Sequence, residues 1–467
     1  MLKLIFAYAI IWSISEDRTY NSGAESYNRV KIIKLIKGWY RLLQTPFGII
    51  FFVWRKENMT NWEELKWRGL VKDVAGDDIA DKINNEKVTF YWGTDPTADS
   101  LHLGHYRSLI TAKRLMKMGH NPILLCGGAT GRIGDPRPTE EREIISIDTL
   151  NHNIECIRKQ IDKVFDGKAK LVNNYEWFKD YNFLDFLRDV GKYINVNYML
   201  SKDIIQRRLD TGITYAEFSY MLIQGYDFLH MFNTMGCTMQ VEGSDQWGNI
   251  TAGIELIRKM TGKDAYAFTM PLILDATGKK FGKSEGNALW LDLNKTSSYE
   301  MYQYLINTDD SKVYEYLKVF TFLTPADIDE IMVKQNENSH LRIAQKALAK
   351  EIITDLHGEE EFNKALNISE CLFSDRIWEL SANEIIDNIK DIPKFNVNNG
   401  ELLIDVLVNN NVVSSKREAR EMKTAGAISI NGKKEIDLEK NITKNDAIED
   451  KVLLIKKGKK NYFLGLM

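Results

Sequence analysis

Two histidines three positions apart, His102 and His105, enclose Gly104 and follow Thr97 after a short apolar run. At the first turn of a helix, such a pair lies on one face beside backbone N–H groups that have no partner within the helix. Imidazole and backbone N–H donors together favour a bound phosphate. Gly104 leaves room where a bulky ligand would approach. The alternative is a pair of histidines that cap the helix or bind a metal ion.

A second candidate is the segment K-F-G-K-S, which contains Lys280, Lys283 and Ser284. Two ammonium groups and a hydroxyl on a glycine-containing loop, here residues 278–286, can wrap a polyphosphate and then release it. A solvated basic loop is the alternative, because a single K-x-G-K-S is a weak signal. No Walker motif competes in the sequence, since the glycines at 127–128 and 131–134 lack the Lys-Ser/Thr that would follow.

The segments around these motifs alternate between strand and helix patterns. We predict strands at residues 88–92, 122–126, 169–172 and 238–241, and helices at residues 103–118, 146–165, 214–235 and 247–260. Strands that alternate with helices at this spacing indicate an α/β fold with a doubly wound parallel sheet. Ligands bind such sheets at the carboxyl ends of the strands, where Gly93 and Gly127 lie.

H-x-G-H and K-F-G-K-S, in this order on this fold, resemble the two ATP signatures of class I aminoacyl-tRNA synthetases. Further blocks resemble the bacterial tyrosyl-tRNA synthetases: Y-W-G-T-D-P-T-A-D-S-L-H from residue 91, G-G-A-T-G from 127, G-D-P from 134, Y-M-L-I-Q-G-Y-D from 220 and G-S-D-Q-W-G-N from 243. The resemblance covers about residues 59–467. It implies activation of L-tyrosine with ATP to tyrosyl-adenylate and pyrophosphate, then transfer to the 3′ end of tRNA(Tyr).

The resemblance also implies a role for each matching residue at the ATP site. The residues expected to act on the phosphates are Thr97, His102, His105, Lys280, Lys283 and Ser284, the last three as a mobile loop. The residues expected to contact the rest of ATP are Gly93, Asp95, Gly104 and Asp245, together with Lys283. Attack of a carboxylate on the α-phosphate needs no covalent enzyme intermediate, so positioning and charge stabilisation carry the catalysis. We expect Mg²⁺ on the ATP phosphates, no metal site built from side chains alone, and no prosthetic group.

For tyrosine, Tyr91 and Asp227 match the family pair that binds the phenol hydroxyl. The residues matching those around the α-ammonium and the reacting carboxyl are Asp135, Tyr220, Gln224 and Gln246. Phenylalanine would leave the polar groups unpaired, and tyrosyl-tRNA synthetases are a known example of such discrimination. Taken singly, Tyr91 and Tyr220 would more often be core aromatics than ligands.

Three positions depart from the pattern of the resembled family. Trp92 stands where many relatives have a small residue near the ribose. Glu242 precedes Gly243 where a second glycine is usual, and it adds a charge beside the region of the substrate carboxyl. Ser284 replaces a threonine and keeps the hydroxyl.

The chain beyond residue 294 is mainly helical in pattern until about residue 391, and Pro393 with N-V-N-N-G then marks a boundary. We predict a Rossmann-like catalytic domain at 59–294, a helical anticodon-binding domain at 295–392 and an S-four-like α+β RNA-binding domain at 398–467. Residues that recur at helical spacing and would face RNA phosphates are Lys416, Arg417, Arg420 and Lys423. Because Glu418 and Glu421 interleave with them, a solvated amphipathic helix is the alternative.

The first 58 residues differ from the rest, with nine Lys and Arg against four Asp and Glu and no clear periodicity. We interpret them as translated leader RNA ahead of a start at Met59. Residues 38–41 can be encoded by a string containing UGGUACC, which resembles the tRNA-sensing bulge of a T-box leader, and residues 55–58 by a purine-rich ribosome-binding site. A genuine basic or disordered extension is the alternative, and residues 4–14 also resemble the apolar core of a secretory signal.

Composition is that of an ordinary globular protein of about three domains: 467 residues, 44% hydrophobic, 27% charged, net charge −3. This balance excludes a disordered chain or one that coats nucleic acid. Four widely spaced cysteines without a C-x-x-C pair argue against a disulfide scaffold and a thiolate zinc site, and favour the reducing cytoplasm. No apolar run reaches the roughly 18 residues that span a membrane.

We therefore expect a cytoplasmic enzyme whose partners are tRNA(Tyr), L-tyrosine and ATP, with no membrane association; the resemblance implies a homodimer. A tryptophanyl-tRNA synthetase shares the fold and the ATP motifs, but Tyr91 and Asp227 offer polar partners to a phenol rather than an indole. A non-catalytic RNA-binding protein built from a synthetase is the other alternative. The retained histidines and lysines of both motifs argue against it.

Overall fold

The computed structural model describes residues 59–467, apart from residues 137–141, 144, 285–286, 375, 390–391 and 459–460. For residues 283, 284 and 287 it describes the backbone alone. The interpretation of residues 1–58 as a leader or an extension lies outside the described residues.

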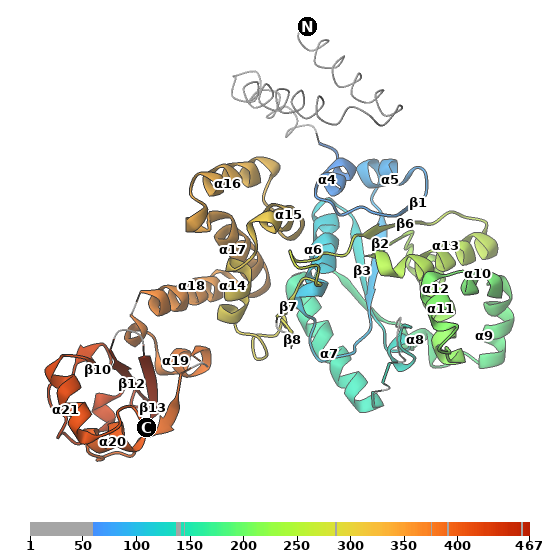
Figure 1. Ribbon diagram of the computed structural model, residues 1–467. Helices are drawn as coiled ribbons and strands as arrows, with labels where there is room; N and C mark the ends of the chain where they lie inside the picture. The colour runs from blue at the N-terminus through green and yellow to red at the C-terminus, as the bar shows by residue number, and fades with distance from the viewer. Residues whose placement is uncertain are drawn as a thin grey trace, which may run out of the picture. The chain divides into compact units, whose positions relative to one another are not determined.

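A six-stranded sheet with the order β1-β6-β5-β2-β3-β4 forms the centre of the part that contains the motifs (Figure 1). Its strands are β1 (Val74–Ala75), β2 (Thr89–Thr94), β3 (Asn121–Cys126), β4 (Lys170–Asn173), β5 (Met239–Gly243) and β6 (Tyr266–Met270). All neighbouring pairs are parallel except β1 with β6 at one edge. The strand order reverses at β2, which has β3 on one side and β5 on the other, and such a reversal opens a crevice for ligands. The predicted parallel sheet is confirmed.

Helices surround this sheet and include every predicted one. They are α4 (Asn61–Trp67), α5 (Ile79–Asn85), α6 (Leu103–Lys117), α7 (Ile147–Val164), α8 (Tyr175–Phe178), α9 (Phe183–Asp189), α10 (Val196–Leu200), α11 (Asp203–Arg208), α12 (Tyr215–Met235) and α13 (Trp247–Thr261). Strand β6 and helices α8 to α11 were not predicted. Each of those helices has seven residues or fewer, too short for a clear amphipathic period.

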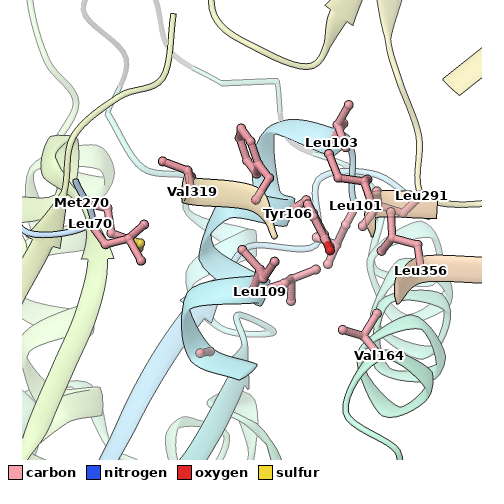
Figure 2. Close-up of a cluster of buried hydrophobic side chains, with 14 of the residues drawn as sticks. Leu70, Leu101, Leu103, Tyr106, Leu109, Val164, Met270, Leu291, Val319 and Leu356 are labelled. Carbon is pink, nitrogen blue, oxygen red and sulfur yellow. The ribbon is translucent and has the colours of Figure 1, made fainter. Parts of the chain in front are cut away.

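Helix α6 is buried on nearly all sides. Leu103, Tyr106 and Leu109 pack among apolar side chains from several other elements, and Figure 2 shows Val164 of α7 and Leu356 within the same cluster. The Tyr106 hydroxyl also donates to Asp355 Oδ2 at 2.9 Å. A helix with so many contacts is held rigidly, and its N-terminus faces the carboxyl ends of the strands.

Six helices follow, in agreement with the predicted helical pattern: α14 (Ser298–Ile306), α15 (Asp310–Phe320), α16 (Pro325–Glu337), α17 (Ile343–His357), α18 (Glu359–Phe373) and α19 (Ala382–Asn388). Their boundaries follow local capping rules. Ser297 and Glu300 form a capping box at α14, and Thr324 precedes Pro325, the first residue of α16. Leu305, Leu317 and neighbouring apolar residues belong to the same core cluster as the first sheet.

The last part of the chain is α+β. A five-stranded sheet has the order β11-β10-β12-β13-β9. Its elements are β9 (Lys394–Asn396), α20 (Leu403–Asn409), α21 (Lys416–Thr424), β10 (Ile428–Ile430), β11 (Lys433–Lys434), β12 (Val452–Lys457) and β13 (Asn461–Leu466). Leu403 and Leu407 of α20 pack in one core with Ile428 and Ile455 of the sheet. The predicted α+β class is confirmed, whereas the domain limits at residues 294 and 398 remain predictions.

Two buried arginines join α4 and α6 to the end of α15. Arg68 donates to the carbonyls of Lys318 and Leu323, each at 2.8 Å, and Arg114 donates to the carbonyl of Thr321 at 2.6 Å. Cationic donors satisfy the carbonyls that a helix leaves free at its C-terminus. Glu64 accepts from both, with Oε1 at 2.7 Å from Arg68 Nε and 3.3 Å from Arg114 Nη1.

Replacing Glu64 with Gln therefore leaves two buried guanidinium groups without their shared negative charge. We expect the free energy of unfolding to fall by about 2 kcal/mol, less than for a fully buried pair because Glu64 is partly exposed. The exposed pair Lys334–Glu330 supplies the control, and Glu330→Gln is expected to change stability by less than about 0.5 kcal/mol. Chemical unfolding followed by circular dichroism measures both, and equal effects would contradict the structural role.

Candidate active site

A cavity of about 440 Å³ opens at the carboxyl ends of the central strands. Among the residues predicted for the site, those that line it are Tyr91, Gly93, Asp95, Thr97, His102, Gly104, His105, Asp135, Tyr220, Gln224, Asp227, Asp245, Gln246 and Lys280. The side chains of Lys283 and Ser284 lie outside the described residues. The structure thus brings together residues that are up to 189 positions apart, from Tyr91 to Lys280.

One end of the cavity is closed by Tyr91 of β2 and Asp227 of α12, which are both 1% exposed. Asp227 accepts from Trp177 Nε1 at 2.9 Å and from Asn174 Nδ2 at 3.0 Å. Burial nevertheless raises the pKa of Asp227 to about 8. Within the described part of the chain, the Tyr91 hydroxyl has no hydrogen-bond partner. A buried hydroxyl without a partner and a buried carboxyl are suited to a ligand hydroxyl that donates to one and accepts from the other.

Two more carboxyls, those of Asp95 and Asp135, line the cavity and are partly buried. Asp135 accepts from Gln246 Nε2 at 2.9 Å, and burial raises its pKa to about 6. Asp95 accepts from the Tyr220 hydroxyl at 3.0 Å, and burial raises its pKa as well. Buried carboxylates are stabilised when a cation enters beside them. This part of the cavity therefore favours an ammonium group.

Asn249 organises the polar side chains around Asp135. Its Nδ2 lies 2.9 Å from Gln224 Oε1, 2.9 Å from Gln246 Oε1 and 3.3 Å from Asp135 Oδ1. One amide thus fixes the orientation of both glutamines. Asn249 lies on the first turn of α13, directly after the segment that contains Gln246.

The two histidines stand at the N-terminus of α6 with their rings stacked 3.9 Å apart. His102 Nδ1 accepts from the backbone N–H of Gly104 at 3.0 Å, and His105 Nδ1 accepts from the N–H of His102 at 3.2 Å. They therefore cap the helix, as the alternative interpretation held, and also line the cavity. Burial, followed by the charge of His102 and Arg107, lowers the pKa of His105 to about 3. An uncharged ring that accepts at Nδ1 carries its proton on Nε2, which makes it a neutral donor.

The segment that carries Lys280 is fastened to the start of α6. The Leu103 N–H of α6 donates to the Leu289 carbonyl at 2.7 Å, while the Phe281 N–H donates to the Ile273 carbonyl, after β6, at 3.0 Å. Gly282 has a φ of +86°, and a Cβ atom there would lie 2.5 Å from the backbone nitrogen of Gly104. Only glycine fits this close approach. After it, β7 (Lys283–Ser284) and β8 (Asn287–Ala288) form a short hairpin.

Aromatic side chains hold the same segment from the helical part. The Phe281 ring lies 4.5 Å from the Phe320 ring and 4.7 Å from the Tyr316 ring. The Tyr304 hydroxyl accepts from the Gly282 N–H at 3.0 Å, and the Tyr316 hydroxyl donates to the Leu274 carbonyl at 3.1 Å. Lys280 is thereby placed at the mouth of the cavity.

Sequence reasoning missed several residues of the site. Arg107 and Arg142 place positive charge along the cavity wall. Asn174 and Trp177 reach Asp227 from the segment after β4, where polar residues at the carboxyl end of a parallel strand are a usable signal. Asn249 is the last residue of the G-S-D-Q-W-G-N block, which also contains Gln246, so the same block could have predicted it as a site residue.

The cations predicted to face RNA lie on α21, away from this cavity. Three of them are paired with carboxylates: Lys416 with Asp405 at 2.5 Å, Arg417 with Glu421 at 2.9 Å, and Arg420 with Glu439 at 3.0 Å. The side chains of these three cations are at least half exposed, and surface pairs contribute little. A phosphate can replace such a carboxylate, so the pairs are compatible with the solvated helix and with RNA binding alike.

A doubly wound sheet with H-x-G-H at a helix N-terminus and K-F-G-K-S against it defines a class I aminoacyl-tRNA synthetase. The family model for "tRNA synthetases class I (W and Y)" matches residues 83–374, and that for the "Tyrosine--tRNA ligase SYY-like C-terminal domain" matches residues 384–465. The tyrosine–tRNA ligase of Streptococcus mutans is 47% identical over 415 residues, which cover 87% of this chain and 99% of that protein. The chain belongs to the tyrosine–tRNA ligases.

Other relatives agree. The tyrosine–tRNA ligase of Listeria welshimeri is 48% identical over 411 residues, which cover 86% of this chain and 98% of that protein. The crystal structure of a C-terminally truncated mitochondrial tyrosyl-tRNA synthetase from Aspergillus nidulans has a TM-score of 0.60 and 33% identity, and the match covers 69% of this chain and 96% of that one.

The raised pKa of Asp227 makes stability depend on pH. Between the ordinary pKa of 3.8 and the folded value of about 8, the folded protein keeps a proton that the unfolded chain releases, so stability falls as pH rises. In the variant Asp227→Asn this side chain no longer titrates. The loss of one accepting oxygen lowers the free energy of unfolding by the same amount at every pH. We expect the free energy of unfolding of the variant, relative to the parent, to rise between pH 5 and pH 8 by up to about 1.4 kcal/mol per pH unit. Chemical unfolding at each pH measures it, and a constant difference would contradict the assignment.

Proposed function

We propose that the chain activates L-tyrosine with ATP and transfers the tyrosyl group to the 3′ end of tRNA(Tyr). One observation carries this proposal: a single cavity joins a buried end, closed by Tyr91 and Asp227, to an end lined by His102, His105 and Lys280. At the junction, a carboxylate oxygen of tyrosine attacks the α-phosphorus while the bond to pyrophosphate breaks. The enzyme supplies position and charge, because no covalent intermediate is required.

At the end of the cavity closed by Tyr91 and Asp227, each polar group of tyrosine would meet matching side chains. The substrate phenol would donate to Asp227 and accept from Tyr91, which satisfies the hydroxyl that lacks a partner within the described part of the chain. The α-ammonium would lie among Asp95, Asp135 and the polar atoms of Tyr220 and Gln224. Gln246 would then lie beside the carboxyl that reacts.

The residues at the other end of the cavity also support the proposed reaction. His105 offers a neutral Nε2–H donor, and His102, Thr97 and Lys280 line the same wall. Lys283 and Ser284 follow in the sequence. Asp245 with Gly93 would hold the ribose. Gly104 makes room for the His102 ring rather than for a ligand, since a Cβ atom there would lie 2.8 Å from His102 Cε1. These groups are mainly donors rather than a cage of oxygen ligands, so the Mg²⁺ that we expect would be carried by the ATP phosphates.

A homodimer is supported by exposed apolar side chains on consecutive helices from α9 to α12. The residues and exposed fractions are Phe183 at 62%, Leu184 at 72%, Val196 at 56%, Leu209 at 46% and Tyr215 at 63%. Large apolar side chains that stay exposed along one stretch of the chain support an interaction surface there. We propose that a second copy of the chain covers it.

The tRNA would be held by the helical part and by the last α+β part, through α21. No helix among the described residues is long and apolar enough to cross a membrane. Cys126, Cys156, Cys237 and Cys371 are unpaired thiols, which fits the reducing cytoplasm that we propose as the location.

Tyrosine-dependent exchange of pyrophosphate into ATP tests the activation step. We expect exchange with L-tyrosine but not with phenylalanine or tryptophan, because only a phenol satisfies both Tyr91 and Asp227. A variant that begins at Met59 should be equally active if residues 1–58 are dispensable. Absence of exchange in a folded sample that binds ATP would favour the RNA-binding alternative.

Binding of tRNA, which the transfer step requires, is tested by removing positive charge from α21. The double variant Arg417→Gln, Lys423→Gln is expected to weaken tRNA binding and to lower the slope of log affinity against log salt by about 1 to 2. Lys168→Gln, which removes an exposed cation between α7 and β4, serves as a control. Filter binding across a salt series measures the slopes. Equal slopes for the double variant and the parent would assign α21 to the solvated alternative.

A further inference from the structure

One departure from the pattern of the family lies inside the cavity and has no role in the reaction described so far. Glu242, near the end of β5, stands where the resemblance leads one to expect glycine; it lines the cavity and is 5% exposed. A buried carboxyl costs free energy unless hydrogen bonds compensate for the lost water. The partners of Glu242 therefore indicate what this side chain does.

Glu242 occupies the point where β2 and β5 separate. The last backbone pair between these two strands, which are both fully described, joins Tyr91 to Gln240. Continued by two residues, the same register would place Gly93 opposite Glu242. At that position the strands no longer pair, and Glu242 Oε1 accepts from the backbone N–H of Gly93 at 2.7 Å. The carboxyl thus takes the place of a backbone partner.

This hydrogen bond changes how Gly93 can serve a ligand. In the proposed function Gly93 helps to hold the ribose, but its N–H is already used by Glu242 Oε1. A Cβ atom at Gly93 would lie 3.6 Å from this oxygen, so the carboxyl lies against the backbone of Gly93. With glycine at position 242 the N–H would be open to the nucleotide. In this chain, a ligand group at the same place meets the carboxyl of Glu242 instead.

The second oxygen of Glu242 is available to such a ligand. Among the described residues, Oε2 has no hydrogen-bond or ion-pair partner. Burial raises the pKa of Glu242 well above its usual range, and the proton belongs on Oε2 because Oε1 accepts from Gly93. A protonated carboxyl can both donate and accept, and it does not repel the phosphates of ATP. The side chain therefore adds a neutral polar group rather than the charge expected from the sequence.

Asp245 brings a second carboxyl to the same end of β5. Its Oδ1 would lie 2.5 Å from a Cβ atom at Gly243, so the side chain folds back against the residue that follows Glu242. Both carboxyls line the cavity. A carboxyl placed near the end of a parallel strand is a common partner of a ribose hydroxyl in nucleotide-binding sheets. Ribose carries two neighbouring hydroxyls, so the two carboxyls match them one to one.

We propose that Glu242 binds one of the two ribose hydroxyls of ATP and that Asp245 binds the other. Glu242 thereby takes over a contact that the N–H of Gly93 cannot make in this chain, and it selects ATP over a deoxyribonucleotide. This inference rests on the proposed function and deepens it, because it names a residue that determines specificity for the nucleotide.

Two analogues of ATP, each lacking one ribose hydroxyl, test the assignment. The parent protein should bind 2′-deoxy-ATP and 3′-deoxy-ATP each about three- to tenfold more weakly than ATP, because each analogue loses one hydrogen bond. In Glu242→Met, ATP should bind more weakly by a similar factor. One analogue should then bind as well as ATP, while the other is still disfavoured through Asp245. Titration calorimetry gives the dissociation constants without turnover.

Three comparisons separate a contact with ribose from general destabilisation. Glu242→Gln keeps an acceptor for the Gly93 N–H and a polar group toward the ribose, so it should retain both preferences. Thr269 is paired with Glu242 in the sheet and is buried, and its hydroxyl donates to Asp73 Oδ2 at 2.6 Å. Thr269→Val should lower the thermal midpoint and leave both preferences unchanged. In Glu242→Met, the dissociation constant for tyrosine should stay within about twofold of the parent value.

The inference is overturned if Glu242→Met binds ATP more weakly but keeps both preferences, which is the result expected from a purely structural contact with Gly93. It is also overturned if the parent binds both analogues as well as ATP, or if Glu242→Met weakens tyrosine binding as much as ATP binding. Failure of the parent to exchange pyrophosphate would instead overturn the proposed function. The preferences between ATP and its analogues would still decide whether Glu242 binds the ribose.

Discussion

The structure depends on the burial of several carboxyl groups at one edge of a parallel sheet. Asp95, Asp135, Asp227 and Glu242 all have pKa values raised by burial. Each is tolerated because donors such as Trp177 and Gln246 have been brought to it from distant parts of the chain. In the proposed function, the ammonium group and the phenol of tyrosine would relieve part of the cost of this burial, which would favour binding of the amino acid.

Helix α6 forms the other end of the cavity, where we propose that ATP binds. Its first turn presents His102 and His105, and its length is surrounded by apolar side chains from the sheet part and the helical part. His105 is thus held as a neutral donor by burial and by its capping hydrogen bond. Lys280 and Arg107 add positive charge along the same cavity, Arg107 from α6 itself and Lys280 from a separate segment.

Much of this organisation is predictable from sequence, and the failures have physical causes. Strands β2 and β3 and helices α6 and α12 were predicted because their apolar patterns are regular and flanked by motifs. Helices α8 to α11 are too short to show a period, and the contacts of Asn174 and Trp177 with Asp227 join residues about 50 positions apart, which spacing does not reveal. The ion pairs on α21 depend on Asp405 and Glu439 in other elements.

The packing of Phe281 on Phe320 and Tyr316 has a consequence for modularity. The segment that carries Lys280 and Phe281 belongs to the first part of the sequence, yet Phe281 packs against Tyr316 and Phe320 of α15. The Gly282 N–H also donates to the Tyr304 hydroxyl of α14. A fragment cut near residue 294 would expose Phe281 and release the loop. To combine this catalytic part with the helices of another synthetase, Phe320 and Tyr316 would have to be transferred with it. The two parts therefore form one unit for protein engineering.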